Sequence, residues 1–316
     1  MVCKLLDERD ERDRDMTKVK VNLYDSMMNP LCLRKDRGVW SITNSSTDPQ
    51  IIEWDYLGGD GPTAVKAAHA PAEKRLITVF TEKDMFSPWA EKDTGQYKVL
   101  FMHECRGIHP QFYKAVPVVE NKFDFIVTHD EDLLKRGPKF LKISSPGNSF
   151  ISDENAKIYE KTKLLSHIVS KQNWARGHKL RYIIAEAIKD KYEVDLWGSA
   201  VRFFDTKLQP LKDYMFSITV MNCMHKDYFT ETLVDTFRCG TIPIFWGCPN
   251  VSDYFNIEGM LIFNTGPELI SILDSLSSEL YKSKMRHVKE NFEIAKEHCQ
   301  IDDKVYNAII AAIEPT

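Results

Sequence analysis

The sequence predicts an α/β protein of two domains, each built on a parallel sheet. Its 316 residues correspond to about two domains of ~150 residues. Short apolar runs flanked by charged residues are too short for globular helices and rich in branched and aromatic side chains, which is typical of buried strands. Stretches long enough for helices separate these runs, and strands that alternate with helices form parallel sheets.

Composition and charge exclude several classes of protein. A chain that is 43% hydrophobic and 28% charged is not mostly disordered, collagen-like or a coiled coil, and a net charge of −4 excludes a strongly basic nucleic-acid binder. No window reaches the ~18 apolar residues of a membrane span, and residues 7–15 are charged where a secretory signal needs an apolar stretch. We therefore expect a cytoplasmic protein (in the host cytoplasm if it is viral), with residues 1–16 as a charged flexible tail.

The seven cysteines are widely scattered and include no C-x-x-C pair. In a reducing compartment, buried thiols act as small apolar fillers. We therefore expect these cysteines to be free thiols.

The first half of the chain predicts an N-terminal domain over residues 17–150. Val19, Val21 and Leu23 alternate with polar residues, which is the period of a half-buried strand. Buried strands are then expected at 76–80, 99–102 and 123–128.

The second half predicts a further α/β domain over residues 151–300, followed by a C-terminal helix over 301–316. Strands are expected at 164–169, 194–197, 216–220, 242–246 and 260–263. An amphipathic helix is expected where apolar residues recur at helical spacing, namely Leu180, Ile183, Ile184, Ala187 and Ile188. Thr230 is a good N-cap for a second helix that carries Leu233, Val234 and Phe237 inward.

The first chemical candidate is residues 103–106, His-Glu-Cys-Arg, directly after the strand at 99–102. Ligands of parallel α/β sheets gather at the carboxyl ends of strands. Glu104 is therefore a candidate general base, and the alternative is a surface loop with an Arg–Glu pair.

The second candidate is residues 129–132, His-Asp-Glu-Asp, after the strand at 123–128. Asp130 and Asp132 have the Asp-x-Asp spacing with which metal-dependent sugar transferases hold Mn²⁺ or Mg²⁺. Acidic residues are also favoured at a helix N-terminus, and the sequence favours this second interpretation.

The third candidate is the segment 197–255. Arg202 follows a strand and has the side chain suited to phosphate oxygens. If Thr230 caps a helix, Glu231 lies in the first turn of that helix, where its carboxylate can accept hydrogen bonds from both hydroxyls of a ribose. The start of a helix also favours a nearby phosphate. A strand, a loop, a capped helix and a further strand together are typical of a nucleotide site.

Other signals are weaker. The glycine-rich residues 58–61 lack the Lys-Ser/Thr of a phosphate-binding loop and favour a turn, with an acceptor-side loop as the alternative. The nine histidines lack paired spacing, so we expect no dedicated zinc site. The motifs of hydrolases, dehydrogenases and kinases are absent.

Residues 214–264 resemble the α-1,3-fucosyltransferase family (glycosyltransferase family 10). The family's motifs run roughly Y-K-F-x-L-x-F-E-N-S, Y-x-T-E-K and G-T-I-P-I-Y-W-G-x-P. This chain has Y-M-F-S-I-T-V-M-N-C at 214–223, Y-F-T-E-T at 228–232 and G-T-I-P-I-F-W-G-C-P at 240–249. The resemblance is to the compact forms of bacteria and of large viruses or phages.

This resemblance implies the GT-B architecture, in which two Rossmann-like domains face a cleft and the C-terminal domain binds the donor. It implies an inverting transfer, most simply of L-fucose, from a GDP-sugar to a glycan hydroxyl, with no metal or other cofactor required. Glu104 would be the catalytic base, and the acceptor would bind N-terminal loops within about residues 25–75. The donor-binding residues would be Arg202 at the diphosphate together with Asn222, Lys226, Tyr228, Thr230 and Glu231.

Three departures alter the expected donor pocket. Met221 stands in place of the family's Glu, Cys223 in place of its Ser, and Thr232 in place of the Lys of T-E-K. The last change removes a cation expected near the diphosphate, for which Lys226 or Arg238 could substitute. Three alternatives stay open: another GDP-hexose such as a rhamnose donor, a metal-dependent transferase that uses Asp130 and Asp132, and a non-catalytic glycan- or nucleotide-binding relative.

Overall fold

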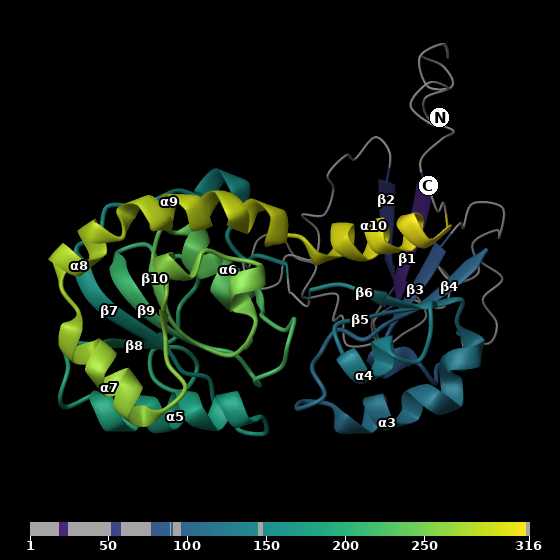
Figure 1. Ribbon diagram of the computed structural model, residues 1–316, viewed down its shortest axis with the longest axis horizontal. Helices are drawn as coiled ribbons and strands as arrows, with labels where there is room; N and C mark the ends of the chain where they lie inside the picture. The colour runs from purple at the N-terminus through teal and green to yellow at the C-terminus, as the bar shows by residue number, and fades with distance from the viewer. Residues whose placement is uncertain are drawn as a thin grey trace, which may run out of the picture.

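The computed structural model describes residues 77–88, 90, 96–144 and 148–313, together with the strand backbones of 19–24 and 52–57. These residues form two parallel sheets with helices packed on both faces (Figure 1). The predicted tail at 1–16, the turn at 58–61, most of the expected acceptor loops within 25–75, and residues 314–316 lie outside the described residues.

The N-terminal sheet has six parallel strands in the order β2-β1-β3-β4-β5-β6. Its strands are β1 (Val19–Tyr24), β2 (Ile52–Leu57), β3 (Ile77–Thr81), β4 (Tyr97–Phe101), β5 (Phe125–Thr128) and β6 (Phe140–Lys142). Its helices are α3 (Pro110–Val119) and the short α4 (Glu131–Leu134), with 3₁₀ turns at Glu82–Asp84 and Glu120–Lys122.

The alternation of side chains along β3 and β4 explains why both strands carry consecutive apolar residues, at 79–80 and 99–101. Val79 and Val99 point to one face, where they pack against α10 (Ile301–Ile313). Phe80 and Leu100 point to the other face and pack against α3. A sheet covered on both sides in this way needs continuous apolar strands rather than alternating ones.

The C-terminal sheet has five parallel strands in the order β11-β10-β9-β7-β8. Its strands are β7 (Lys163–Ile168), β8 (Asp195–Trp197), β9 (Tyr214–Val220), β10 (Ile242–Trp246) and β11 (Leu261–Ile262). Its helices are α5 (Arg176–Ile188), α6 (Glu231–Arg238), α7 (Gly266–Ser275), α8 (Ser278–Ser283) and α9 (Met285–Ile294), and 3₁₀ turns lie at Asp153–Asn155, Val251–Asp253, Ile257–Gly259 and Ala295–His298.

The strand order of this sheet reverses between β7 and β9. The chain goes from β7 outward to β8 and then returns to the other side of β7. Ligands of open α/β sheets bind at the carboxyl ends of the strands at such a reversal. α5 and α7 lie on one face of the sheet and α6 and α9 on the other (Figure 1), so the loops after β7 and β9 meet at this point.

The predicted α/β class, parallel sheets and main helices are confirmed. Thr230 caps α6, since its side chain accepts the N–H of Thr232, and Leu233, Val234 and Phe237 are buried as expected. The helix predicted from the apolar spacing is α5, although Ile183 is 62% exposed rather than packed inside. The final predicted helix is α10, which crosses back to the N-terminal sheet (Figure 1).

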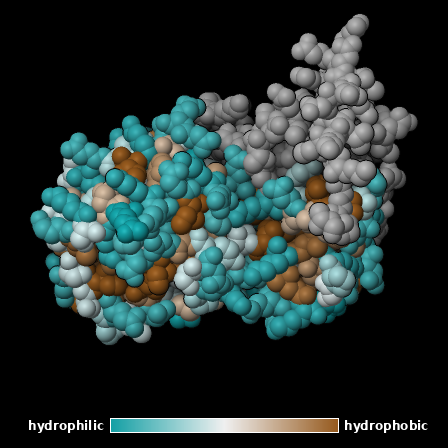
Figure 2. Space-filling model, turned by 45° about the horizontal axis from the view of Figure 1, so that its top comes forward, coloured by the Kyte–Doolittle hydropathy of each residue, from teal (hydrophilic) through white to brown (hydrophobic). Residues whose placement is uncertain are grey.

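The visible face in Figure 2 is mostly hydrophilic, and its hydrophobic residues gather in separate patches. Among the helices that the structure describes, none combines the length and the apolar character needed to cross a membrane.

Candidate active site

The loop after β4 packs into the C-terminal domain. Cys105 is fully buried in a cluster whose other members come mainly from α6 and the loops after β9 and β10, including Met221, Tyr228 and Phe229. Gly107 lies against the same surface, because a Cβ added there would stand 3.0 Å from the Cβ of Cys223. The carboxyl ends of β4 and β9 therefore meet across the domain boundary.

A disulfide joins the two domains at this contact. It links Cys105 to Cys223 across 118 residues of sequence, so the expectation that all the cysteines are free thiols is wrong for this pair. Of the other described cysteines, Cys239 and Cys248 are buried free thiols. Each bonded cysteine directly follows a predicted site residue, Glu104 in one domain and Asn222 in the other.

Glu104 contacts one of the predicted donor-binding residues directly. The hydroxyl of Tyr228 donates to Oε2 of Glu104 at 3.2 Å. Burial, reinforced by the charge of Glu104, raises the pKa of Tyr228 well above its ordinary value, so the phenol stays a proton donor at neutral pH. The ring of His129 lies 5.2 Å from that of Tyr228, and burial lowers the pKa of His129 to about 3, which keeps this imidazole neutral.

Asn222 continues the hydrogen-bond chain into α5. Nη2 of Arg181 donates to Oδ1 of Asn222 at 2.9 Å, and its Nε donates to the carbonyl of Val220 at 2.8 Å. Since Oδ1 is thereby taken, the amide nitrogen of Asn222 faces the Tyr228 hydroxyl at 3.5 Å. Arg181, Asn222, Tyr228 and Glu104 thus form one connected polar group. The sequence reasoning missed Arg181, because no motif distinguishes it from the other charged residues of α5.

Thr230 and Glu231 lie at the start of α6, beside this group. Glu231 accepts a hydrogen bond from the hydroxyl of Thr232 at 3.1 Å, and Thr230 forms the N-cap. The backbone N–H of Thr230 points at Sδ of Met221 at 3.3 Å. Met221 is fully buried, and its Cγ would lie only 2.3 Å from a Cβ added to Gly247. The Met that replaces the family's Glu is therefore packed beneath the cap of α6.

The structure does not bring the predicted cations to this group. Lys226 pairs with Glu131 of the other domain at 2.7 Å. Arg238 is buried and bonded to the Ile151 carbonyl and to the Asp153 carboxylate.

Arg202 also lies apart from the group. Its guanidinium stacks on the ring of Trp197, 3.5 Å from the centroid, and lies 4.0 Å from Asp195. Both contacts are with β8, which runs from Asp195 to Trp197, and no described contact joins the side chain of Arg202 to the polar group.

A cation that the sequence reasoning missed does lie at the strand reversal. Arg176 is the exposed first residue of α5, and its guanidinium stands over the Trp246 ring, 5.2 Å from the centroid. Among the described side chains, no carboxylate pairs with it. The next residue fixes its place: the N–H of Gly177 donates to the Asn222 carbonyl at 2.8 Å, and a Cβ there would be 1.7 Å from the Met221 carbonyl oxygen. Only glycine permits this approach, which sets Arg176 beside the polar group.

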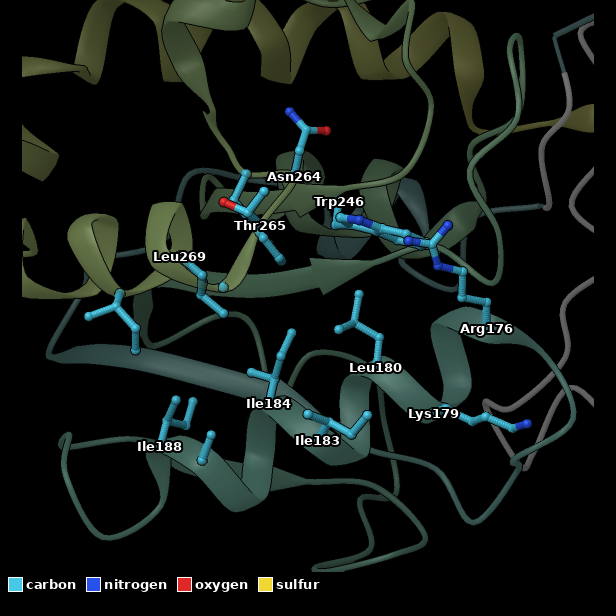
Figure 3. A pocket seen from close by; sticks show the side chains of 14 residues that line it. Arg176, Lys179, Leu180, Ile183, Ile184, Ile188, Trp246, Asn264, Thr265 and Leu269 are labelled. Atoms are coloured by element: carbon cyan, nitrogen blue, oxygen red, sulfur yellow. The ribbon is translucent and has the colours of Figure 1, made fainter.

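Figure 3 shows the side chains of Arg176 and Trp246 next to each other at one end of a groove between α5 and α7. The groove has a volume of about 570 Å³, and its remaining lining is mostly apolar, as at Leu180, Ile184 and Leu269. One sequence signal could have found Arg176: it begins the helix that follows the first strand of the second sheet, where helix N-termini and cations favour phosphate.

The acidic residues at 130–132 form a helix start, as the sequence favoured. Asp130 caps α4 by accepting the N–H groups of Asp132 and Leu133, and Arg106 binds both of its oxygens at 2.7 and 2.9 Å. The Arg–Glu pair that was the alternative to a general base is therefore wrong, since Arg106 pairs with Asp130 and not with Glu104. Asp132 is 73% exposed. In the part of the chain that the structure describes, no cluster of three or more His, Cys, Asp or Glu side chains is arranged to hold a metal ion.

Comparison with known proteins shows what the C-terminal domain is similar to. Residues 158–299 match the model of the glycosyltransferase family 10 (fucosyltransferase) C-terminal domain. The C-terminal domain is family 10-like. The match contains all six predicted donor-binding residues, namely Arg202, Asn222, Lys226, Tyr228, Thr230 and Glu231.

Curated relatives of this family 10-like chain include the 4-galactosyl-N-acetylglucosaminide 3-alpha-L-fucosyltransferase 9 of Mus musculus. It is 29% identical over 177 residues, which cover 52% of this chain and 46% of that protein. The Homo sapiens protein of the same name is 29% identical over 143 residues, which cover 44% and 37%. The chain thus matches less than half the length of these relatives.

Solved structures agree on the fold. A crystal structure of an alpha1,3-fucosyltransferase with GDP-fucose aligns over 90% of both chains with a TM-score of 0.52 and 13% identity. An alpha-glucosyltransferase in complex with UDP and DNA aligns over 95% of this chain and all of its own, with a TM-score of 0.59 and 11% identity. The family 10-like chain therefore has the GT-B fold that its sequence resemblance implied.

Proposed function

We propose that this protein is an inverting glycosyltransferase that moves L-fucose from GDP-fucose to a hydroxyl of a glycan, with Glu104 as the general base. One observation carries the proposal. Glu104, from the N-terminal domain, meets Tyr228 of the family 10-like domain at 3.2 Å, where the carboxyl edges of the two sheets come together. This is the position where a base from one domain can serve a donor held by the other.

Glu104 has one carboxylate oxygen available for the chemistry. Its Oε2 accepts the Tyr228 hydroxyl, whereas no described residue bonds to Oε1. In the proposed step the acceptor oxygen bonds to the anomeric carbon, the bond from that carbon to the diphosphate breaks, and the acceptor proton passes to Oε1. A positioned base of this kind contributes ~10²–10⁴-fold to the rate. Since attack comes from the face opposite the leaving group, the configuration inverts.

The departing diphosphate needs a cation, because Thr232 stands where the family has Lys. Lys226 and Arg238 are engaged in other ion pairs. We assign this role to Arg176, which has no carboxylate partner among the described side chains and begins α5 at the strand reversal. A forked guanidinium suits phosphate oxygens. Glu231, in the first turn of α6, would accept the ribose hydroxyls, with Asn222 and Tyr228 at the sugar.

The test uses the full chain with GDP-fucose and a 4-galactosyl-N-acetylglucosaminide, the acceptor named for the curated relatives. We expect release of GDP together with a product heavier by one deoxyhexose, whose anomeric configuration, read by NMR, is opposite to that of the donor. GDP-fucose that is neither transferred to any oligosaccharide of an acceptor panel nor hydrolysed would contradict the proposal. Retention of configuration would contradict the inverting mechanism alone.

A second donor has one specific observation in its favour. Thr232 and Met221 change the pocket where the family has Lys and Glu, so another GDP-hexose, such as GDP-rhamnose, is the alternative to GDP-fucose. Comparing kcat/KM across GDP-sugars separates the two. Full activity in excess EDTA would remove the metal-dependent alternative that uses Asp130 and Asp132, and turnover of any donor would remove the non-catalytic one.

A further inference from the structure

A buried carboxylate lies directly behind the proposed base. Glu82 follows β3, the strand that neighbours β4 in the sheet, and is only 2% exposed. Burying a carboxylate costs free energy unless hydrogen bonds compensate for the lost water. The partners of Glu82 therefore indicate what it does.

Both oxygens of Glu82 accept hydrogen bonds from consecutive peptide groups of the loop after β4. Oε2 accepts the N–H of His103 at 2.9 Å, and Oε1 accepts the N–H of Glu104 at 3.2 Å. Burial raises the pKa of the Glu82 carboxyl, and the His103 charge and the His103 N–H offset part of that rise. The Glu82 carboxylate thus links the end of β3 to the backbone that follows β4, at Glu104, the proposed general base.

The main chain of Glu104 is held from its other side as well. The hydroxyl of Tyr113 on α3 donates to the Glu104 carbonyl at 2.6 Å. Both backbone polar groups of Glu104 are therefore bonded within its own domain, while its side chain reaches Tyr228 in the other. Freedom at this position is left mainly to the side-chain torsions.

We propose that Glu82 is a positioning residue for the transfer reaction: it fixes the backbone from which Glu104 reaches the acceptor hydroxyl. This proposal rests on the function proposed above. Displacing a catalytic group by ~1 Å can cost ~10²-fold in rate. Losing one of the two hydrogen bonds from Glu82 to the backbone of His103 and Glu104 should therefore lower turnover. Donor binding should not change, because Glu82 contacts no predicted donor-binding residue of the C-terminal domain among those described.

The test compares Glu82→Gln with Asp124→Asn. Gln keeps one carbonyl oxygen, but its NH₂ group faces the second backbone N–H and cannot accept from it. Asp124 is the matched control, because its carboxylate also accepts a backbone N–H on β4, that of Lys98 at 2.7 Å, but at the end of the strand away from Glu104. We expect kcat to fall about 10–100-fold in E82Q, with KM for GDP-fucose and Kd for GDP within about twofold of the wild type, and D124N to keep the wild-type kcat.

Amide hydrogen exchange gives a readout that does not depend on activity. The amides of His103 and Glu104 should exchange faster in E82Q than in the wild type, while amides of the C-terminal sheet keep their protection. If E82Q does not fold, Glu82→Asp, which keeps the charge and both acceptor oxygens but is one methylene shorter, should fold and show the same split between kcat and KM at a smaller size.

The two proposals fail in different ways. A wild-type protein without transferase activity would refute the proposed function. If the wild type is active but the E82Q or E82D variant keeps full kcat, the positioning role of Glu82 is refuted and the proposed function is not. The same holds if kcat and GDP affinity fall together in the variant.

Discussion

The hydrogen bond between Tyr228 and Glu104 makes a quantitative prediction about how the two domains are coupled. Tyr228→Phe removes a buried hydroxyl that donates to Glu104 at 3.2 Å and faces the Asn222 amide at 3.5 Å. A hydrogen bond to a charged group contributes ~1.5–3 kcal/mol, and because 3.2 Å is longer than the ~2.7–2.8 Å typical of such bonds, we take the lower figure of ~1.5 kcal/mol. The long Asn222 contact adds a few tenths more, so Y228F should lower the free energy of unfolding by about 2 kcal/mol.

A double-mutant cycle isolates the part of this loss that belongs to Glu104. In a Glu104→Gln background the acceptor is neutral, and a neutral hydrogen bond is worth about half of a charged one. Y228F should therefore cost only about 1 kcal/mol there, a coupling of about 1 kcal/mol. The assay is urea-induced unfolding followed by tryptophan fluorescence.

The matched control is Tyr254→Phe, whose hydroxyl donates to Asp227 at 2.5 Å and not to Glu104. Y254F should cost the same in both backgrounds. If Y228F also costs the same in both, within ~0.3 kcal/mol, the contact across the domain boundary does not exist in solution.

Three further predictions concern the cation, the disulfide and the buried histidine. Arg176→Ala should weaken GDP binding, measured by titration calorimetry, about 10–100-fold, because a charged hydrogen bond contributes ~1.5–3 kcal/mol. Arg202→Ala should change GDP binding less than twofold. A large loss in Arg202→Ala with little change in Arg176→Ala would show that Arg202, and not Arg176, binds the diphosphate. Cys105→Ser should remove the peptide that links Cys105 to Cys223 from a non-reducing digest and lower stability by ~2–4 kcal/mol, and a wild-type digest without that linked peptide would contradict the disulfide. The pKa of His129 falls from 6.5 to about 3 on folding, so the unfolded state binds the proton first as pH falls. The stability that depends on the neutral His129 ring is therefore present above pH 6.5 and is lost as pH falls toward 3, at ~1.4 kcal/mol per pH unit. His129→Gln should make stability less steeply dependent on pH below 6.5, and an unchanged slope would show that His129 is not buried as a neutral ring.

Much of the fold could be predicted from local sequence. Strands buried on both faces have continuous apolar runs, so the sequence predicts β10 at its observed bounds of Ile242–Trp246 and the other interior strands with ends shifted by one or two residues. Thr230 was identifiable because capping chemistry is local. Glu104 could be singled out for a topological reason, since a polar side chain directly after a parallel strand lies at the edge where ligands bind.

The remaining features depend on contacts between distant parts of the chain. The Cys105–Cys223 bond spans 118 residues, and no local pattern signals such a pair. An Arg after a strand can extend to the ligand edge or fold back onto an aromatic ring. Arg202 stacks on Trp197. Arg176 takes the place at the edge because Gly177 lets α5 approach Met221, an arrangement visible only in three dimensions.

We propose that Glu104 takes the acceptor's proton in a site whose donor half lies in the other domain. Glu104→Gln tests it most directly, because Gln keeps the shape and loses the basicity. We predict that its kcat with GDP-fucose falls ~10²–10⁴-fold while the Kd for GDP stays within about twofold of the wild type. Wild-type turnover by E104Q would show that Glu104 is not the general base.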